Sequence, residues 1–382
     1  MLPPTCSLIV IDSMIYLHIP FCHRKCTYCA FYSVVTSSDK QAYVDALCSE
    51  LAMRRHEVCH PVRTVYFGGG TPTVLTIGQI GQIVETIRLY YDVSAIEEAT
   101  LEANPEDLTQ EYLKGLKSLG FFNRISIGVQ SFHDSDLKLL NRRHSAHQAV
   151  EAVKEAFVAG FGNISIDLIY GLPHQSVEQW RENLRQVERL PVSHLSAYAL
   201  SVEPGTMLWS QVEQGRVVVA DEEESLQHYE TLIEWSSKTG FGQYEISSFC
   251  KQGFKSRHNS RYWDYTPYLG VGAAAHSFDG HSRRWNVPDV RKYVASVVNG
   301  AIDFQKEDLD ENDAYNEYVM TALRTTDGIA KAMIPSKYAK ELSRSVEQLV
   351  AKGLIMETPT HYVPTRQGLL QADGIAAELF ID

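Results

Sequence analysis

The stretch HIPFCHRKCTYCAF, from His18 to Phe31, carries the strongest signal in this 382-residue chain, because it places three cysteines on one short loop. Cys22, Cys26 and Cys29 have the spacing C-x3-C-x2-C. Three thiolates on a tight loop suit three corners of a cubane iron–sulfur cluster, whereas structural zinc sites take four N or S donors, usually from C-x2-C pairs. The basic triplet at 23–25 is hard to bury between core cysteines. The spacing therefore favours a cluster over zinc, a redox dithiol or buried packing.

Outward from this loop, short apolar runs alternate with helix-period segments roughly every 30 residues, which is typical of β-α units and a parallel sheet. The predicted strands are 15–19, 64–67, 99–102, 124–127, 164–169 and 194–199. The predicted helices between them include 39–55, 76–90, 146–159 and 176–189. We therefore expect an α/β fold built on a partial (β/α)6 barrel.

Polar residues and glycines fall at or just after the ends of these predicted strands, at Cys22, Gly68 to Gly70, Glu102, Gln130 and Asp167. In parallel α/β barrels the site is built at the carboxyl ends of the strands. These five positions are therefore expected to meet in one place.

The pattern changes after about residue 303, where helices at 311–324 and 343–352 precede a hairpin-like IMETPTHYVPT and a final helix at 366–379. This order resembles a small winged-helix unit. Acidic residues outnumber basic ones there, so a packing or lid role is favoured over DNA binding. The expected organisation is a tail or over-called start at 1–13, the barrel at 14–240, an extension at 241–302 and the C-terminal unit at 303–382.

The composition argues against some classes of binding partner. The formal net charge of −12 argues against a nucleic-acid surface, and no apolar run approaches the ~18 residues of a membrane span. Seven cysteines, unevenly spaced, do not form a disulfide framework, and the start of the chain lacks the basic and apolar pattern of a signal peptide. We expect a cytoplasmic protein that binds small molecules or other proteins.

The C-x3-C-x2-C loop, with Tyr28 before its last cysteine, resembles that of the radical S-adenosylmethionine (SAM) superfamily. The longer string YLHIPFCHRKCTYCAFYS is similar to the branch that contains oxygen-independent coproporphyrinogen III dehydrogenase and the HemW-like heme chaperones. The resemblance implies a 4Fe-4S cluster on Cys22, Cys26 and Cys29, with the fourth iron left open for SAM. It also implies that an electron donor reduces the cluster, and that SAM is then split into methionine and a 5′-deoxyadenosyl radical.

The residues themselves support a SAM pocket. The glycines at 68–70 let backbone approach a ligand closely, and Glu102 can accept from ribose hydroxyls or an ammonium, or else serve as a solvated acid at a helix entry. Arg142 offers a planar fork for a carboxylate, although Arg143 is an alternative. Asp167 lies in an apolar strand, where an unpaired charge is costly. The resemblance assigns SAM contacts to Tyr16, Tyr28, Gly69, Gly70, Thr71, Glu102, Gln130, Arg142 and Asp167.

Two features separate the members of this branch. By resemblance, the dehydrogenase has a fourth cysteine two residues after the third, where this chain has Phe31, as HemW-like proteins do. The motif HNSRYW at 258–263 also resembles the HemW-like H-N-x-x-Y-W, whose histidine is proposed to bind heme. His258 is therefore the candidate heme ligand, with a packed or capping histidine as the alternative. For His18 and His276 we prefer a core or hydrogen-bonding role.

These features predict a heme chaperone that binds heme and passes it to an acceptor hemoprotein, expected to be respiratory and reached by peripheral contact with the membrane. The alternative is a coproporphyrinogen III dehydrogenase, which removes hydrogen from two propionate side chains and forms vinyl groups by decarboxylation. A radical SAM enzyme with another substrate is a third hypothesis, because loops rather than the fold set specificity.

Overall fold

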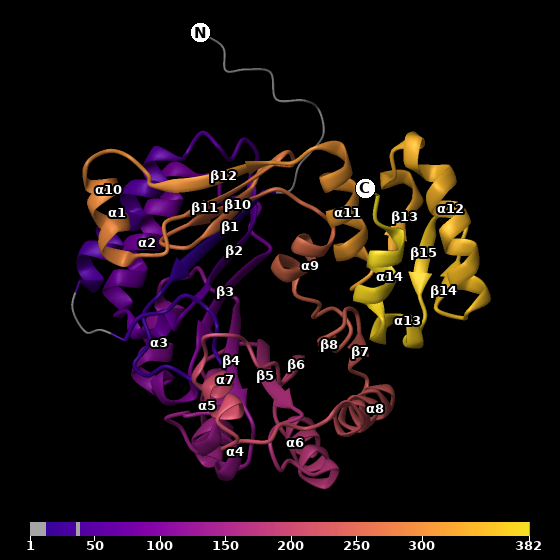
Figure 1. Cartoon of the computed structure of the whole chain (residues 1–382). Helices are drawn as coiled ribbons and strands as arrows, with labels where there is room; N and C mark the ends of the chain where they lie inside the picture. The colour runs from indigo at the N-terminus through magenta and orange to yellow at the C-terminus, as the bar shows by residue number, and fades with distance from the viewer. Residues whose placement is uncertain (1–12, 36–38, 382) are drawn as a thin grey trace.

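The computed structural model describes residues 13–35 and 39–381, and it is an α/β chain with a small C-terminal unit at one side (Figure 1). Of the tail predicted at 1–13, residues 1–12 lie outside the described residues, and Ser13 belongs to the first strand.

Six parallel strands form the centre of the sheet in chain order, and all six predicted strands are confirmed. They are β1 (Ser13–Ile19), β2 (Val62–Gly69), β3 (Glu98–Ala103), β4 (Arg124–Gln130), β5 (Asn163–Tyr170) and β6 (His194–Ala199). Most residues of these strands are buried on both faces of the sheet. This is expected for parallel strands, because the helices that connect them cover the sheet. The expected α/β fold with a partial barrel is confirmed.

Short strands extend this sheet to twelve strands. At one edge β9 (Tyr268–Val271) pairs parallel to β1, followed by antiparallel β10 (His276–Phe278), β11 (Ser282–Asn286) and β12 (Phe304–Asp308). At the other edge, β8 (Ser248–Cys250) and β7 (Gly242–Gln243) are antiparallel. These strands were not among the predicted ones, because most are too short to show a periodic pattern.

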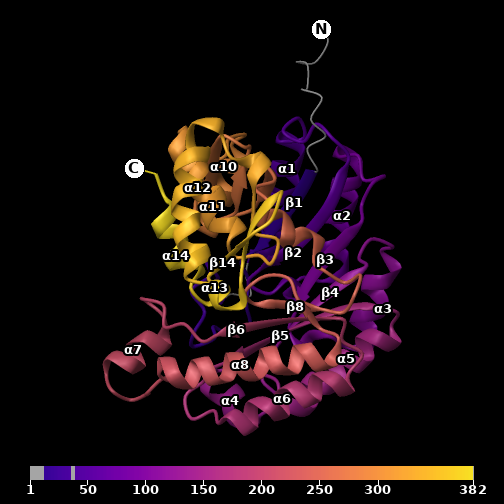
Figure 2. The ribbon, with the colours of Figure 1, turned by 90° about the vertical axis from the view of Figure 1, so that its right-hand side faces the viewer.

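Helices cover the outer face of the sheet, as Figure 1 shows for the first of them. They are α1 (Lys40–Met53), α2 (Ile77–Tyr90), α3 (Gln110–Ser118), α5 (Ala146–Val158), α6 (Val177–Arg189) and α8 (Glu222–Thr239). Two shorter helices, α4 (Asp134–Leu139) and α7 (Met207–Glu213), contact the cysteine loop at Thr27. Capping boxes at Thr76, Ser145, Ser176 and Asp221 fix where α2, α5, α6 and α8 begin. Figure 2 shows α6 and α8 side by side beneath the sheet.

A buried ion pair attaches the added strands to the first helix. Glu50 of α1 bonds to Arg54 at 3.0 Å and accepts from the backbone N–H of Gly272 at 2.9 Å. Tyr293, on α10 (Val290–Val298), donates its hydroxyl to Glu50 at 2.7 Å, and Arg54 donates to the carbonyl of Gly270 at 2.7 Å. Buried charges persist where they are paired and hydrogen-bonded, so this network fixes β9 against α1.

The C-terminal unit has its own core and a three-stranded sheet, β13 (Ile329–Ala330), β15 (His361–Pro364) and β14 (Ile355–Glu357). Its helices are α11 (Glu311–Ala322), α12 (Ser336–Ala351), α13 (Arg366–Leu370) and α14 (Ala372–Leu379). The expected small C-terminal unit is confirmed, although α12 begins earlier than predicted, directly after Pro335, and the single predicted final helix is two. Within the described part of the chain, no helix combines the length and apolar character of a membrane span.

Candidate functional site

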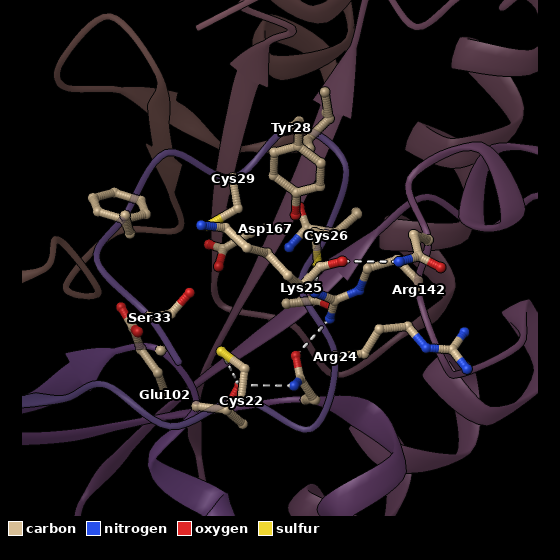
Figure 3. A pocket seen from close by; sticks show the side chains of 18 of the residues that line it. Cys22, Arg24, Lys25, Cys26, Tyr28, Cys29, Ser33, Glu102, Arg142 and Asp167 are labelled. Carbon is tan, nitrogen blue, oxygen red and sulfur yellow. Dashed lines mark hydrogen bonds between the residues drawn. The ribbon is translucent and has the colours of Figure 1, made fainter. Parts of the chain in front are cut away.

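A cavity of about 620 Å³ lies where the cysteine loop meets the carboxyl ends of the parallel strands (Figure 3). Residues from all five strand-end positions line it, so their predicted convergence is confirmed. Among the lining residues are Cys22, Cys26, Tyr28, Cys29, Gly69, Gly70, Thr71, Glu102, Gln130, Arg142 and Asp167. Its size lies within the range of small-molecule sites, about 300–1,000 Å³.

The cysteine loop is held by neighbouring backbone. The N–H of Cys22 donates to the carbonyl of Val34 at 3.0 Å, and the N–H of Thr27 donates to that of Leu140 at 3.2 Å. Burial raises the pKa of the Cys22 and Cys29 thiols. No group of three or more His, Cys, Asp or Glu side chains in the described residues is placed to hold a single metal ion. The thiols lie apart around one cavity (Figure 3), which fits a cluster of several irons.

A hydrogen-bond chain connects two of these cysteines across the cavity wall. Arg142 donates from Nη1 to Sγ of Cys26 at 3.3 Å and from Nη2 to Oδ1 of Asn104 at 2.6 Å. Asn104 donates to the hydroxyl of Thr71 at 3.1 Å, and that hydroxyl donates to Sγ of Cys22 at 3.6 Å. Asn104 was not among the predicted site residues, although its place directly after the end of β3 was the available signal.

Both terminal nitrogens of the Arg142 guanidinium already have hydrogen-bond partners in the protein. Nη2 also donates to the carbonyl of Gly128 at 2.6 Å. Its buried Nε has no hydrogen-bond partner among the described residues. An orphaned buried donor beside a cavity indicates a ligand or water position. Arg143 lines the same cavity and lies 3.8 Å from Glu106, so Arg142 is the arginine that reaches the cysteines.

Two carboxyl groups face the cavity from β3 and β5. Glu102 accepts from the hydroxyl of Tyr66 at 2.7 Å and from the N–H of Gly69 at 3.2 Å. Burial, with the nearby Asp167, raises the pKa of Glu102 to about 7. Burial likewise raises the pKa of Asp167 to about 6. Such shifts are typical of carboxyl groups in functional sites, where a cationic ligand favours the ionised form.

The glycines after β2 are required by close packing. Gly69 has φ +106°, and a Cβ there would lie 2.5 Å from Nδ1 of His18. A Cβ on Gly70 would lie 2.8 Å from the carbonyl oxygens of Ile19 and Phe21. Both positions therefore exclude a side chain, which keeps the strand end close to the cysteine loop.

Of the two tyrosines predicted to contact SAM, only one lines the cavity. Tyr28 lines the cavity and packs against the apolar group around Leu140, whereas Tyr16 is not among the lining residues. The Tyr16 hydroxyl lies 3.0 Å from Nδ1 of His18, and Nε2 of His18 lies 3.0 Å from the carbonyl of Tyr32. Since a carbonyl only accepts, Nε2 carries the proton and Nδ1 accepts from Tyr16. The preferred core role of His18 is confirmed.

His258 lies away from the cavity on α9 (Arg257–Trp263) and is 0% exposed. Its Nδ1 lies 2.8 Å from the Thr64 hydroxyl and its Nε2 lies 3.1 Å from the Tyr262 hydroxyl. Its ring stacks on Tyr66 at 5.0 Å, and burial lowers its pKa to about 3. Heme ligation by His258 stays a prediction, and it requires one of these hydrogen bonds to break.

His276 is exposed rather than in the core. Its Nδ1 lies 3.2 Å from the carbonyl of Ala274, and its ring stacks on Trp285 with centroids 5.9 Å apart. Of the two roles expected for His276, hydrogen bonding is confirmed and a core position is not, because its side chain is exposed on β10, near the edge of the extended sheet.

Comparison with known proteins matches two families: the radical SAM superfamily over residues 16–187 and the HemN C-terminal domain over residues 309–370. A heme chaperone HemW from Bacillus subtilis is 34% identical over 94% of this chain and 97% of its own length. A heme chaperone HemW from Lactococcus lactis is 31% identical over 96% and 97%, respectively. The solved structure of Escherichia coli coproporphyrinogen III oxidase (HemN), described as a radical SAM enzyme, has a TM-score of 0.83 at 24% identity, covering 97% of this chain and 90% of that one. This structural similarity shows that the two proteins share a fold.

Proposed function

Because this chain belongs to the HemW family of radical SAM proteins, we propose that it is a heme chaperone, which binds heme and transfers it to an acceptor hemoprotein. The observation that carries the proposal is the identity of 31–34% to heme chaperones named HemW over nearly the whole chain. Full-length similarity matters here, because a shared barrel alone does not determine function.

Phe31 supports the same choice. Phe31 lines the cavity, and 71% of its surface is exposed. By resemblance, the dehydrogenase has a cysteine at this position. A phenyl group cannot supply a thiol for metal binding or for hydrogen transfer. The cavity therefore differs from the dehydrogenase pattern beside its cysteine loop.

The family implies a 4Fe-4S cluster and SAM, and the cavity residues fit both. Cys22, Cys26 and Cys29 would hold the cluster, since they are three thiols around one cavity. The two carboxyl groups, the unpartnered Nε of Arg142 and the backbone at Gly69 would bind SAM. When bound, the reduced cluster supplies the electron that cleaves SAM, while the chain binds, orients and shields the cofactors.

The proposal includes two further partners. A separate electron donor would reduce the cluster, and the acceptor would be a respiratory hemoprotein reached from the cytoplasm by peripheral contact with the membrane. A coproporphyrinogen III dehydrogenase is the alternative, but the likeness to HemN is one of fold.

One parallel assay tests the choice. Anaerobically reconstituted protein is titrated with hemin, and in a second vessel it receives coproporphyrinogen III, SAM and a reductant. We expect a saturable Soret band and no protoporphyrinogen IX. Formation of protoporphyrinogen IX at a catalytic rate would reject the chaperone and support the dehydrogenase, whereas absence of both signals would reject both.

A further inference from the structure

The buried His258 of the HNSRYW motif is linked to the cysteine-lined cavity through the side chain of Tyr66. The imidazole stacks on the Tyr66 ring, with centroids 5.0 Å apart and an angle of 28° between the planes. The Tyr66 hydroxyl donates to Oε1 of Glu102 at 2.7 Å, and Glu102 lines the cavity. Neither His258 nor Tyr66 is among the lining residues, so both lie behind the wall to which Glu102 belongs.

Strand β2 holds His258 at two successive positions of one face. Helix α9 contacts β2, and Figure 1 shows α9 on the side of the sheet away from α1 and α2. Thr64 and Tyr66 are two residues apart in β2, so their side chains point to the same side of the sheet. The Thr64 hydroxyl lies 2.8 Å from Nδ1 of His258, and Tyr66 meets the ring itself. The imidazole is therefore fixed by a hydrogen bond and by a ring contact.

Strand β3 fixes the start of the same helix. The side chains of Glu98 and Glu102 are four residues apart in β3 and point to one side of the sheet. The buried carboxyl group of Glu98 accepts from the backbone N–H groups of Arg257 at 2.9 Å and of His258 at 3.0 Å. These are donors that the first turn of a helix leaves unpaired. One face of β3 therefore carries both the support of α9 and the carboxyl group that faces the cavity.

The ring of Tyr66 is closely surrounded. It is buried, and it also stacks on the ring of Tyr16 with centroids 6.2 Å apart. A Cβ on Gly68 would lie 2.8 Å from Cε1 of Tyr66 and 3.1 Å from Oε2 of Glu102, so the glycine lets the strand end approach both side chains. Removing the imidazole of His258 would take away one of the two aromatic contacts of Tyr66 and leave space beside its ring.

The Tyr66 hydroxyl affects both the position and the charge of Glu102. Oε1 of Glu102 accepts from Tyr66, while Oε2 accepts from the N–H of Gly69 at 3.2 Å, so β2 supplies a donor to each oxygen. Burial raises the pKa of Glu102 to about 7, and the hydrogen bond from Tyr66 opposes this rise because it favours the ionised form. Losing that bond would weaken the attraction of Glu102 for the positive groups of SAM near neutral pH.

The contacts of His258 favour this indirect role over heme ligation. Both ring nitrogens lie within hydrogen-bond distance of hydroxyl groups, those of Thr64 and Tyr262, and the residue is 0% exposed. An axial ligand needs a free nitrogen lone pair directed at the iron. The ring contact with Tyr66, in contrast, is already in place.

We propose that His258 is a positioning residue for SAM binding: its ring holds Tyr66, and Tyr66 holds the carboxyl group of Glu102 toward the cavity. The inference rests on the proposed function in one respect, since it takes SAM as the ligand of this cavity. It gives the HNSRYW motif a role at the SAM site, through the helix face that carries His258.

The test is SAM titration of the full-length, anaerobically reconstituted protein, followed by EPR at pH 6, 7 and 8, for wild type, Y66F, H258A and Y66F/H258A. Y66F should weaken SAM binding roughly tenfold at pH 7, as expected when one hydrogen bond to an ionised group is lost. H258A should act in the same direction. Because His258 acts through the Tyr66 hydroxyl, H258A should cause no further loss in the Y66F background.

The pH dependence supplies a second readout. Without the Tyr66 donor, the pKa of Glu102 increases, so SAM affinity should rise at a higher pH in Y66F and in H258A than in wild type. The other ionisable groups that interact with Glu102 are the same in every variant, and they are Asp167, Arg124, Tyr16, Tyr198 and Tyr262. A merely destabilising substitution would not move this pH.

Two further variants serve as controls. H258F keeps an aromatic ring beside Tyr66 and should retain most of the SAM affinity that H258A loses. H194A removes a matched histidine, because His194 is also 0% exposed and its ring nitrogens lie 2.7 Å from the hydroxyls of Ser165 and Tyr244. His194 is not among the residues that line the cavity, so H194A should bind SAM as wild type does. Iron and sulfide content checks that each variant is folded and loaded.

Several outcomes would overturn the proposal: wild-type SAM affinity in H258A, an equal further loss on adding H258A to Y66F, or an equal loss in H194A. A parallel hemin titration, read from the Soret band, keeps the proposed function separate. If H258A and H258F bind SAM normally but lose the Soret band, His258 is a heme ligand and the positioning role is wrong. If the wild type binds no hemin while H258A and Y66F show the expected SAM effects, the chaperone function fails and the positioning role stands.

Discussion

Nη1 of Arg142 lies 3.3 Å from Sγ of Cys26, so the segment after β4 contacts the cysteine loop directly. This contact completes a wall in which Thr71 reaches Cys22 and Arg142 reaches Cys26. The loop is therefore oriented by side chains of the barrel. Orientation by neighbouring donors is typical of ligands at metal centres.

The first prediction concerns the cluster ligands. C22A, C26A and C29A should each abolish the 4Fe-4S cluster, because a cluster held by three thiolates does not survive the loss of one. C48A and C250A should load normally, since Cys48 and Cys250 lie outside the cavity. Iron and sulfide content with EPR after reconstitution checks this. Full loading of C26A would contradict the ligand set.

The second prediction concerns Glu102 and pH. Its pKa of about 7 means that it is mainly protonated at pH 6 and mainly ionised at pH 8. SAM carries a sulfonium and an ammonium, so it favours the ionised form and lowers this pKa on binding. SAM affinity should therefore increase as pH rises through 7 and decrease below it.

E102Q should bind SAM more weakly at pH 8 and show a flatter profile, with Asp167, whose pKa is about 6, responsible for the remaining dependence. Arg124 and Tyr66 also face Glu102 and stay charged and neutral, respectively, over this range. SAM titrations monitored by EPR at pH 6, 7 and 8 measure the effect. An unchanged profile in E102Q would assign the titration to another group.

The third prediction concerns the glycine after β2. G69A should destabilise the fold by about 1–3 kcal/mol, because its positive φ and the nearby His18 ring leave no room for a Cβ. G78A, at an open position in α2, should change stability by less than about 1 kcal/mol. Urea unfolding of the two variants compares them. Equal stabilities would show that the strand end can adjust.

The fourth prediction concerns the buried pair. E50A should lower the free energy of unfolding by about 3–5 kcal/mol, because Arg54 keeps its charge in a buried site without this partner. E85A removes the exposed partner of Arg88 and should cost less than about 1 kcal/mol. Thermal and urea unfolding measure both. A small effect for E50A would mean that Glu57, the other partner of Arg54, is sufficient.

The barrel could be predicted because its signals are local. Apolar runs marked each of the six parallel strands, and the capping residues Ser145 and Ser176 lie at the starts of the predicted helices 146–159 and 176–189. The short strands β7 to β12 were not predicted, because most are too short to show a periodic pattern, and β8 and β9 join the sheet only by pairing with the remote strands β6 and β1.

The candidate site, too, could be predicted only in part. The convergence of Cys22, Glu102 and Asp167 followed from a general rule for parallel strands, and the structure places them in one cavity. The position of Tyr16 outside that cavity, and the role of Asn104 between Thr71 and Arg142, depend on side-chain contacts that no rule of spacing contains.

By itself, the sequence determined the cysteine loop, the parallel α/β core and the strand ends at which the polar residues lie, because these depend on order and spacing along the chain. Only the tertiary structure decided that His258 is enclosed by Thr64 and Tyr262, and that its ring stacks on Tyr66. The physical reason is that a short helix such as α9 has no strong periodicity of its own, so the packing of remote elements determines which of its faces is buried and which is left accessible.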